Sequence, residues 1–183
     1  MKSAVEISAK ILKELAKVAA KPNQNRDHLE MIRADSHEGK LRLWATNGHC
    51  LISRIFEEID HDGPGHSYEL GPIKKLKNSD VLTWENGGLF DEYCRALPCL
   101  HHTIGDPPDI DQVIPKLIES FDGPSTRAIS FNPKLIGLVI NVCERIGDHE
   151  GIAGRLQIGV DDLAPVRFDY GSALGVVMPC RAD

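Results

Sequence analysis

The stretch LRLWATNGHCLIS, residues 41–53, gives the clearest structural signal in the sequence. Apolar residues alternate along its first half, as they do in a strand that buries one face. Asn47 and Gly48 follow, and both tolerate the positive φ that a tight two-residue hairpin turn demands. Residues 41–46 and 50–56 are therefore predicted to be two strands joined by this turn.

Composition limits the class of protein. The chain has 183 residues, of which 42% are hydrophobic and 26% charged, as is usual for a globular protein. The formal net charge of −6 argues against a uniformly basic nucleic-acid binder, but a basic stripe on an acidic body remains compatible with it. The five cysteines are odd in number and irregularly spaced, which argues against a disulfide framework.

Two observations bear on location in the cell. Residues 1–18 interleave charged and apolar residues and lack the continuous apolar stretch of a signal peptide. The longest apolar run, residues 135–140, is far too short to span a bilayer. A cytoplasmic protein without membrane contact is therefore expected.

The order of predicted elements is similar at the two ends of the chain. Before residue 57 the sequence favours a strand, a helix and then three strands. These lie at 5–8, 9–20, 28–34, 41–46 and 50–56. After residue 125 it favours a strand, a helix that begins after the Asn132-Pro133 cap and ends at Gly147, and three strands. These lie at 128–131, 134–146, 154–160, 165–170 and 174–179.

The middle of the chain, residues 57–125, contains HDGPGH, ENGG and GDPPD and only short apolar runs. Such turn signals predict a loop-rich segment. The fold class predicted from these patterns is α+β, with two pseudo-symmetric halves at about 1–60 and 125–183. Each half has one helix packed on antiparallel strands, and both helices are expected on the same face of the sheets.

The two predicted helices carry basic side chains opposite their apolar faces. Lys10, Lys13, Lys17 and Lys21 recur at i, i+3, i+7 and i+11 along the first helix. Lys134 and Arg145 fall on the polar side of the second helix. A charged stripe of this kind is usually only a solvated helix face.

Four short motifs resemble the bacterial DNA polymerase III beta sliding clamp family, and they occur in that family's chain order. Residues 45–51, ATNGHCL, resemble its ATDGHRL, with Asn47 in place of Asp and Cys50 in place of Arg. Residues 108–115, PDIDQVIP, resemble its PDY-x-x-V-I-P linker. Residues 131–136, FNPKLI, are similar to its FNPKYLL, and residues 177–181, VMPCR, to its VMPMR.

The resemblance implies a DNA-clamp-like fold in a shortened form. Family members have three such domains per chain and close as dimers into a ring around DNA, and 183 residues cannot hold three. Either the chain is one clamp-like domain, residues 1–183, with an insertion at about 57–125, or it is a compressed remnant of the last two domains. The first interpretation is preferred because both helical halves are complete.

The resemblance also implies two binding surfaces. In the family, the ATDGHRL stretch, the PDY linker and the C-terminal VMPMR line a hydrophobic groove that binds peptides of polymerases and clamp loaders, and apolar side chains suit such a groove. Carried over, its wall is Thr46, Gly48, His49, Leu51, Pro108, Val113, Val177, Met178 and Pro179. The family also lines its ring with basic helices, which implies that Lys10, Lys13, Lys17, Lys21, Lys134 and Arg145 contact double-stranded DNA non-specifically.

Enzymatic alternatives have weaker support. Cys94, Cys99, His101 and His102 lie close together, but their spacing does not match a structural zinc site. The aspartates that would suggest a magnesium nuclease sit among turn residues, as solvated aspartates normally do. They are Asp106, Asp109, Asp111, Asp161 and Asp162. Nothing resembles a nucleophile elbow or a phosphate loop, so no enzyme, metal or cofactor is expected.

Two functions follow as hypotheses. The first is a sliding-clamp-like replication processivity factor that assembles as a homo-oligomer, holds DNA and docks a replication protein's peptide. The second is a stand-alone clamp-fold interaction module that regulates a replisome without encircling DNA.

Overall fold

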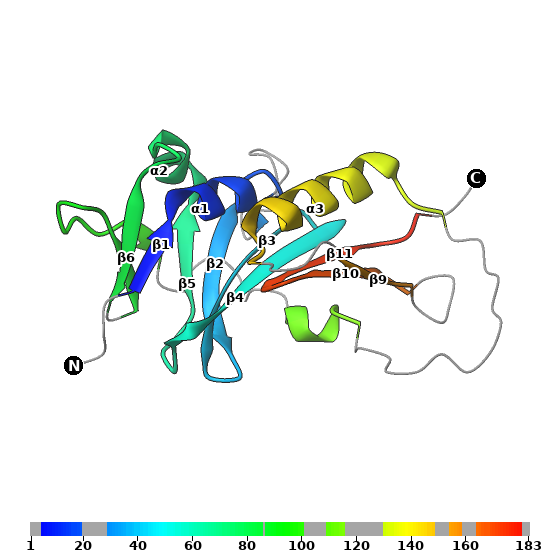
Figure 1. Ribbon diagram of the computed structural model, residues 1–183, viewed down its shortest axis with the longest axis horizontal. Coiled ribbons are helices and arrows are strands. Elements are labelled where there is room, and N and C mark those ends of the chain that lie inside the picture. The colour runs from blue at the N-terminus through cyan, green and yellow to red at the C-terminus, as the bar shows by residue number, and fades with distance from the viewer. Residues whose placement is uncertain are drawn as a thin grey trace.

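The computed structural model describes residues 5–19, 29–85, 87–100, 109–115, 130–148, 154–158 and 164–180. Within these residues, antiparallel strands form two sheets, and three α-helices lie together along one side of them (Figure 1). The α+β class expected from the sequence is confirmed. None of the helices in the described residues is long and apolar enough to cross a membrane.

The N-terminal elements follow the predicted order of strand, helix and three strands. They are β1 (Val5–Ser8), α1 (Ala9–Leu15), β2 (Met31–His37), β3 (Lys40–Thr46) and β4 (Cys50–Asp60). The helix begins where Ser8 caps it, since the Ser8 hydroxyl accepts a hydrogen bond from the Lys10 backbone N–H. It ends earlier than predicted, at Leu15, and β4 extends four residues beyond its predicted end.

The prediction of a loop-rich segment over 57–125 is wrong for its described part. After the end of β4 this part contains β5 (His66–Glu69), α2 (Leu70–Lys75), β6 (Val81–Glu85), β7 (Gly88–Phe90), β8 (Cys99–Leu100) and the 3₁₀ turn η2 (Ile110–Gln112). These elements are short. Strands β5 and β6 are held by pairing with β2 and β1, which are distant in the chain, and no local pattern reveals such pairing. The order of strand, helix and three strands therefore occurs twice within residues 5–100.

Each of these two units lends its first strand to the other. Strand β1 pairs with β6, so the smaller sheet has the order β1-β6-β7. Strand β5 pairs with β2 in the larger sheet, whose order is β8-β5-β2-β3-β4-β11-β10-β9. All the pairs are antiparallel. This exchange ties the two units into one body.

The C-terminal elements add a helix and three strands to the same body. They are α3 (Pro133–Ile146), β9 (Arg155–Gln157), β10 (Val166–Tyr170) and β11 (Ala173–Val177). As predicted, the Asn132 side chain caps α3 and Gly147 ends it. The strand predicted at 128–131 is wrong for residues 130 and 131, which are not in a strand, while 128 and 129 lie outside the described residues.

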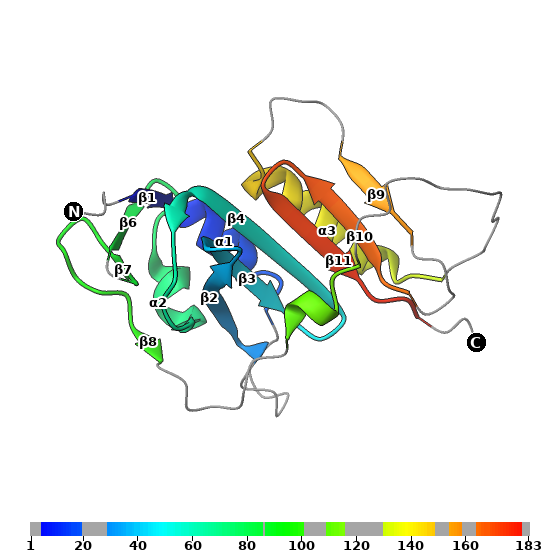
Figure 2. The same cartoon turned by 90° about the horizontal axis from the view of Figure 1, so that it is seen from below.

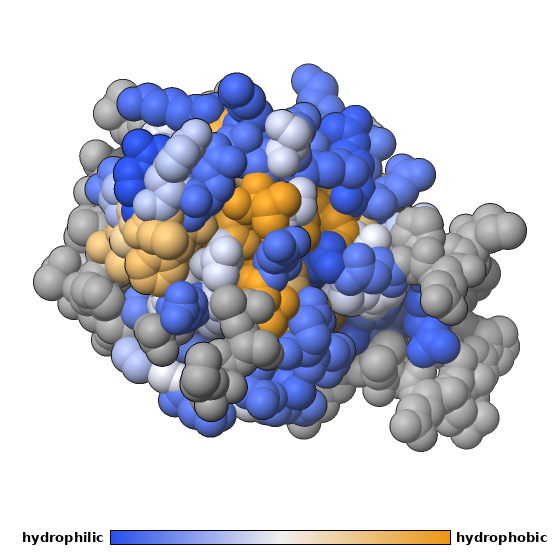
Figure 3. All heavy atoms as spheres, turned by 60° about the vertical axis from the view of Figure 1, so that its left-hand side comes forward, coloured by the Kyte–Doolittle hydropathy of each residue, from blue (hydrophilic) through white to orange (hydrophobic). Residues whose placement is uncertain are grey.

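Strands β4, β11 and β10 lie side by side (Figure 2), and α1 packs against α3 on the helix side. The expected placement of both predicted helices on one side of the sheets is thus observed. The division of the chain into halves at 1–60 and 125–183 stays a prediction. At the end that carries β1 and β6, a small apolar area is surrounded by hydrophilic side chains (Figure 3), and Val81 of β6 is 44% exposed there.

Apolar side chains lie on both faces of the larger sheet. The main core lies between the sheets and the helices and includes Leu12, Ile52, Val142 and Val177. A smaller cluster, separate from it, contains Trp44, Leu51, Ile110 and Val176. Since successive strand residues point to opposite faces, Cys50 and Val177 join the main core while their neighbours Leu51 and Val176 join the smaller cluster.

Glycine is required at position 175, where α3 crosses β11. A Cβ atom there would lie 2.2 Å from Val139 Cγ1 and 3.0 Å from Cys143 Sγ, so α3 would have to move. We expect Gly175→Ala to lower the free energy of unfolding by about 1–3 kcal/mol through overpacking. Gly137→Ala is the matched control, because Gly137 lies within α3 with open space around it.

Alanine is the better helix former, so the control is expected to stabilise the protein by about 0.5–1 kcal/mol. Urea unfolding of the two variants checks both signs. A stabilised Gly175→Ala variant would contradict the close approach of α3 to β11.

Candidate functional site

The turn between β3 and β4 is held by side chains as well as by its glycine. Gly48 has a φ of 84°, whereas Asn47 does not use the positive φ that the sequence analysis allowed it. Instead, Asn47 Oδ1 accepts hydrogen bonds from the backbone N–H groups of His49 and Cys50, at 2.9 and 3.0 Å. The Thr46 hydroxyl donates to the Cys50 carbonyl at 2.7 Å. The turn is therefore a rigid platform.

The environment of Cys50 in this turn disfavours a nucleophilic role. Its thiol is buried, and burial raises its pKa to about 11, although the hydrogen bond to Asn47 lowers it slightly. The thiol is therefore protonated at neutral pH, and a thiolate is required for nucleophilic or metal-ligand chemistry. The turn instead presents Gly48 and His49, which are both exposed.

The C-terminal motif lies directly beside this turn. Leu51 and Val176 are paired residues of β4 and β11, and the Met178 backbone N–H donates to the His49 carbonyl at 2.9 Å. Met178 and Pro179 are both half-buried next to it. The two motifs, 130 residues apart in the sequence, thus form one continuous edge.

The third motif completes the arrangement from the face opposite the helices. The 3₁₀ turn η2 lies below the sheet in Figure 1, where Ile110 packs into the smaller apolar cluster with Trp44, Leu51 and Val176. Ile114 and Leu174 are partly buried against this cluster. The three motifs predicted to meet do converge on one side of the sheet.

The side chains that meet differ in part from those predicted. Val177 points into the main core beneath the helices, and its neighbour Val176 takes the place expected for it. Val113 is half-buried outside the cluster, and Ile110 of the same segment is the buried residue that joins Leu51 in it. Pro108 lies outside the described residues. The sequence analysis missed Trp44, Ile110, Ile114, Leu174 and Val176.

A buried guanidinium fastens η2 to the sheet. Arg42, only 3% exposed, donates from Nε and Nη2 to both carboxylate oxygens of Asp35 at 2.8 and 2.9 Å. It also donates from Nη1 to Asp111 Oδ1 at 2.5 Å. Burial lowers the pKa of Arg42, but its hydrogen bonds to these two carboxylates outweigh that and raise it overall. Arg42 thus bridges β2 and η2 as a permanent cation.

The neighbours of Arg42 support the same arrangement. Trp44 Nε1 donates to Asp35 at 3.0 Å, which fixes the indole in the cluster, and His37 Nδ1 lies 3.1 Å from Arg42 Nη1. At the far end of the turn segment, Arg167 donates to the Pro115 carbonyl at 2.9 Å. Polar contacts therefore hold both ends of residues 111–115.

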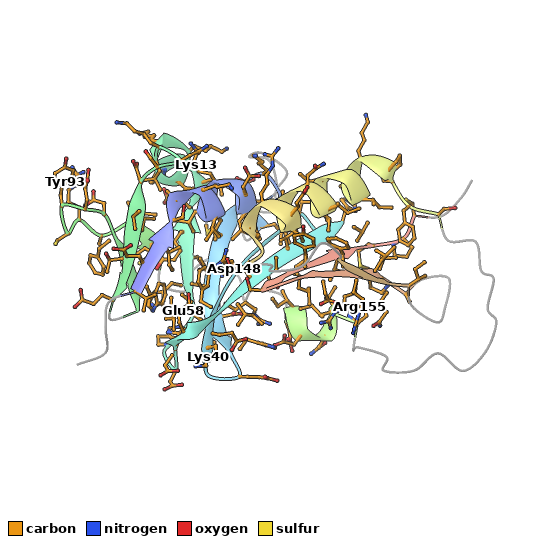
Figure 4. All side chains as sticks on the ribbon, viewed as in Figure 1. Lys13, Lys40, Glu58, Tyr93, Asp148 and Arg155 are labelled. Carbon is orange, nitrogen blue, oxygen red and sulfur yellow. The ribbon has the colours of Figure 1, made fainter. Side chains whose placement is uncertain are left out.

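The predicted DNA-contacting residues that are described lie on α1, in the turn that follows it and on α3, on the helix side, as Lys13 shows in Figure 4. Lys10 and Lys134 are exposed. Lys13 donates to the Leu76 carbonyl at 2.8 Å, Lys17 donates to Glu14 at 2.6 Å, and Arg145 approaches Glu14 at 3.2 Å. Three of these cations are therefore partly committed within the molecule.

Helix α2 adds two basic residues that the sequence analysis missed. Lys74 and Lys75 are exposed in its last turn. They were overlooked because residues 57–125 gave no helical period long enough to reveal a six-residue helix. Lys21 lies outside the described residues.

The metal-site alternatives gain no support from the described residues, in which no group of three or more His, Cys, Asp or Glu side chains is arranged around a common point. Cys94 is exposed in a turn, and His101 and His102 lie outside the described residues. Asp109 caps η2, and Asp111 binds Arg42, so both have structural roles. Asp106, Asp161 and Asp162 lie outside the described residues.

No family model and no curated protein matches this sequence. Solved structures do match. The DNA polymerase III beta subunit of Borrelia burgdorferi, solved with a natural product, superposes with a TM-score of 0.67 at 13% identity and covers 99% of this chain. That of Pseudomonas aeruginosa gives a TM-score of 0.67 at 13% identity over 98%, and that of Caulobacter crescentus 0.62 at 16% over 98%.

The chain has the fold of the bacterial beta sliding clamps. It spans 63%, 67% and 66% of the Borrelia, Pseudomonas and Caulobacter chains, so it matches a shortened form of the clamp. The identities are low enough that the likeness establishes the fold and no more.

Because Asp111 is hydrogen-bonded to Arg42, the stability of the fold is expected to depend on pH in the acidic range. The Arg42 guanidinium holds the pKa of the Asp111 carboxyl below its ordinary value, chiefly by hydrogen bonding. The folded state therefore gains stability from ionised Asp111 above the unfolded pKa of about 3.9, and loses it as the pH falls through the lower folded value. We expect Asp111→Asn to flatten the dependence of unfolding free energy on pH below about pH 4.

Urea unfolding at a series of pH values measures this slope. An identical slope in Asp111→Asn and the unchanged protein between about pH 4 and pH 2 would contradict the ionic attachment of η2.

Proposed function

We propose that this protein is a non-enzymatic, sliding-clamp-like factor of DNA replication that docks a replication protein's peptide and holds double-stranded DNA without reading its sequence. The observation that carries the proposal is the convergence of the 46–51 turn, η2 and residues 174–179 on one side of the sheet. Three separate segments of the chain meet there, and each contributes an apolar side chain to the cluster.

The chemistry of this convergence suits an extended peptide. Buried Leu51, Ile110 and Val176 supply a firm apolar floor, and half-buried Met178 is a flexible thioether side chain at the rim. Methionine adapts its shape to different apolar partners, which favours a surface that binds several related peptides. Thr46, Gly48, His49 and Pro179 complete the proposed wall, and Arg42 holds η2 in place against it.

The helix side is the proposed DNA-facing surface. The exposed cations Lys10, Lys74, Lys75 and Lys134 lie on three helices along one side of the sheets. Lysines spread over helix surfaces attract phosphates through charge without contacting bases, so such binding depends on salt and not on sequence.

One observation favours the second candidate function, a clamp-fold interaction module that does not encircle DNA. Lys13, Lys17 and Arg145 contact groups within the molecule, and the net charge is −6. Both features weaken attraction to a polyanion. Sizing the protein in solution separates the candidates, since a ring built from chains of this length requires several copies.

We expect a short peptide with Leu and Phe anchors to bind the groove, and Met178→Ala to weaken that binding by about 1–3 kcal/mol. Val81→Ala is the matched control, because Val81 is an exposed apolar residue at the other end of the molecule. Calorimetric titration gives the affinities, and thermal unfolding verifies that each variant is folded. Equal affinity of a folded Met178→Ala variant and the unchanged protein would refute the groove.

We expect Lys10→Glu with Lys74→Glu to abolish weak, salt-sensitive binding to duplex DNA, because charge reversal repels phosphates. Figure 4 shows Lys40 and Arg155 away from the helix side. Lys40→Glu with Arg155→Glu makes the same change of charge there and is expected to retain DNA binding. Fluorescence anisotropy at low and moderate salt measures DNA binding by both double variants. Equal losses in the two variants, or no binding by the unchanged protein at low salt, would rule out this DNA-facing surface.

A further inference from the structure

A cavity of about 520 Å³ lies at the end of the molecule away from the proposed groove. Residues from β1, the end of β4, the 61–64 loop, β5 and β6 line it. Its volume is within the range of about 300–1,000 Å³ that small-molecule sites occupy. Nothing in the proposed clamp function uses it.

The inner wall of the cavity is aromatic and apolar. Trp84 is 5% exposed, and the imidazole rings of His61 and His66 meet its indole edge to face, with ring centroids 5.3 and 6.3 Å away. Both histidines are more than nine-tenths buried. Ile59 and Val5 add aliphatic surface. This wall suits the aromatic or aliphatic body of a small molecule.

The rim of the cavity is strongly acidic. Four exposed carboxylate side chains line it, and none of the lining residues that the structure describes is Lys or Arg. They are Glu58, Asp60, Asp62 and Glu85. Figure 4 shows Glu58 on the side of the sheets away from the helices, near Lys40.

The raised pKa of Lys40 reflects the negative potential beside this rim. Its ammonium donates to Asp60 at 2.9 Å, and this hydrogen bond, with further attraction from Asp60, Glu57 and Glu58, raises the Lys40 pKa. Lys40 offsets only one of the four rim carboxylates. A second cation placed at the mouth would therefore be attracted by the remaining three, at short range and in the partial shelter of the cavity.

We propose that this cavity binds a small organic cation whose aromatic or aliphatic body packs against Trp84, His61 and His66 and whose ammonium group lies among the rim carboxylates. Indole faces and edges accommodate such bodies, and an aromatic wall favours a neighbouring cation. An anionic ligand is disfavoured because it would meet four carboxylates and, among the described lining residues, no Lys or Arg. The inference does not rest on the proposed clamp function, since the groove and the cavity share no residue.

The test uses phenethylamine as the probe and 2-phenylethanol as its neutral counterpart of similar shape. The chain has two tryptophans, so Trp44→Phe leaves Trp84 as the only indole that reports on the cavity. We expect the amine to change Trp84 fluorescence and to bind about tenfold more tightly than the alcohol. Added salt is expected to weaken only the amine.

The decisive variant is Glu58→Gln with Glu85→Gln, which removes two rim charges at exposed positions. We expect it to weaken amine binding about tenfold and to leave the alcohol unchanged. Glu92→Gln with Glu144→Gln removes the same charge from exposed sites outside the cavity and is expected to bind like the unchanged protein. Thermal unfolding of all variants confirms that each is folded.

Three outcomes would overturn the proposal. The first is equal affinity for amine and alcohol, and the second is unchanged amine binding by the folded Glu58→Gln, Glu85→Gln variant. The third is no response of Trp84 fluorescence to the amine up to about 10 mM, which would place any affinity below that of an ordinary weak ligand. None of these outcomes bears on peptide or DNA binding.

Discussion

The antiparallel pairing of β4 with β11 is the interaction on which the rest of the structure depends. It joins residues 5–100 to the C-terminal helix and strands, and its register sets Leu51 opposite Val176 and Cys50 opposite Val177. A slip of one residue would turn every side chain of β11 to the other face. Val176 would then lie beneath α3 and Val177 in the smaller cluster. Register therefore decides both which residues form the core and which form the proposed groove.

Arg42 attaches η2 to the face of the sheet opposite the helices, whereas hydrophobic packing attaches the helices to the other face. The η2 segment is short, and Ile110 is its only buried residue, so packing alone gives it little stability. The charge-assisted hydrogen bonds from buried Arg42 to Asp35 and Asp111 supply directional restraint, and such bonds are stronger than neutral ones. These bonds restrain η2 on this side of the sheet, and such preorganisation would reduce the entropy lost on binding the proposed peptide.

Charge is distributed unevenly over the molecule. The helix side carries exposed lysines on α1, α2 and α3, while the cavity at the β4–β5 end has an acidic rim. The net charge of −6 does not reveal this separation, because it is a sum over the whole chain. The buried Glu14 carboxylate contacts both Lys17 and Arg145, and its contact with Arg145 joins α1 to α3.

The sequence by itself determined the elements whose signals are local. Alternation and an Asn-Gly turn defined β3 and β4, and the Asn132 cap and Gly147 defined α3. The order of four motifs predicted the clamp fold and the convergence of the 46–51 turn with residues 177–179. Only the tertiary structure decided the rest. Strands β5 and β6 pair with β2 and β1, far away in the chain, and the register chose Val176 over Val177. The cavity brings together residues 5, 58–64, 66, 84, 85 and 87. Such choices depend on pairing between distant segments, and no local pattern contains that information.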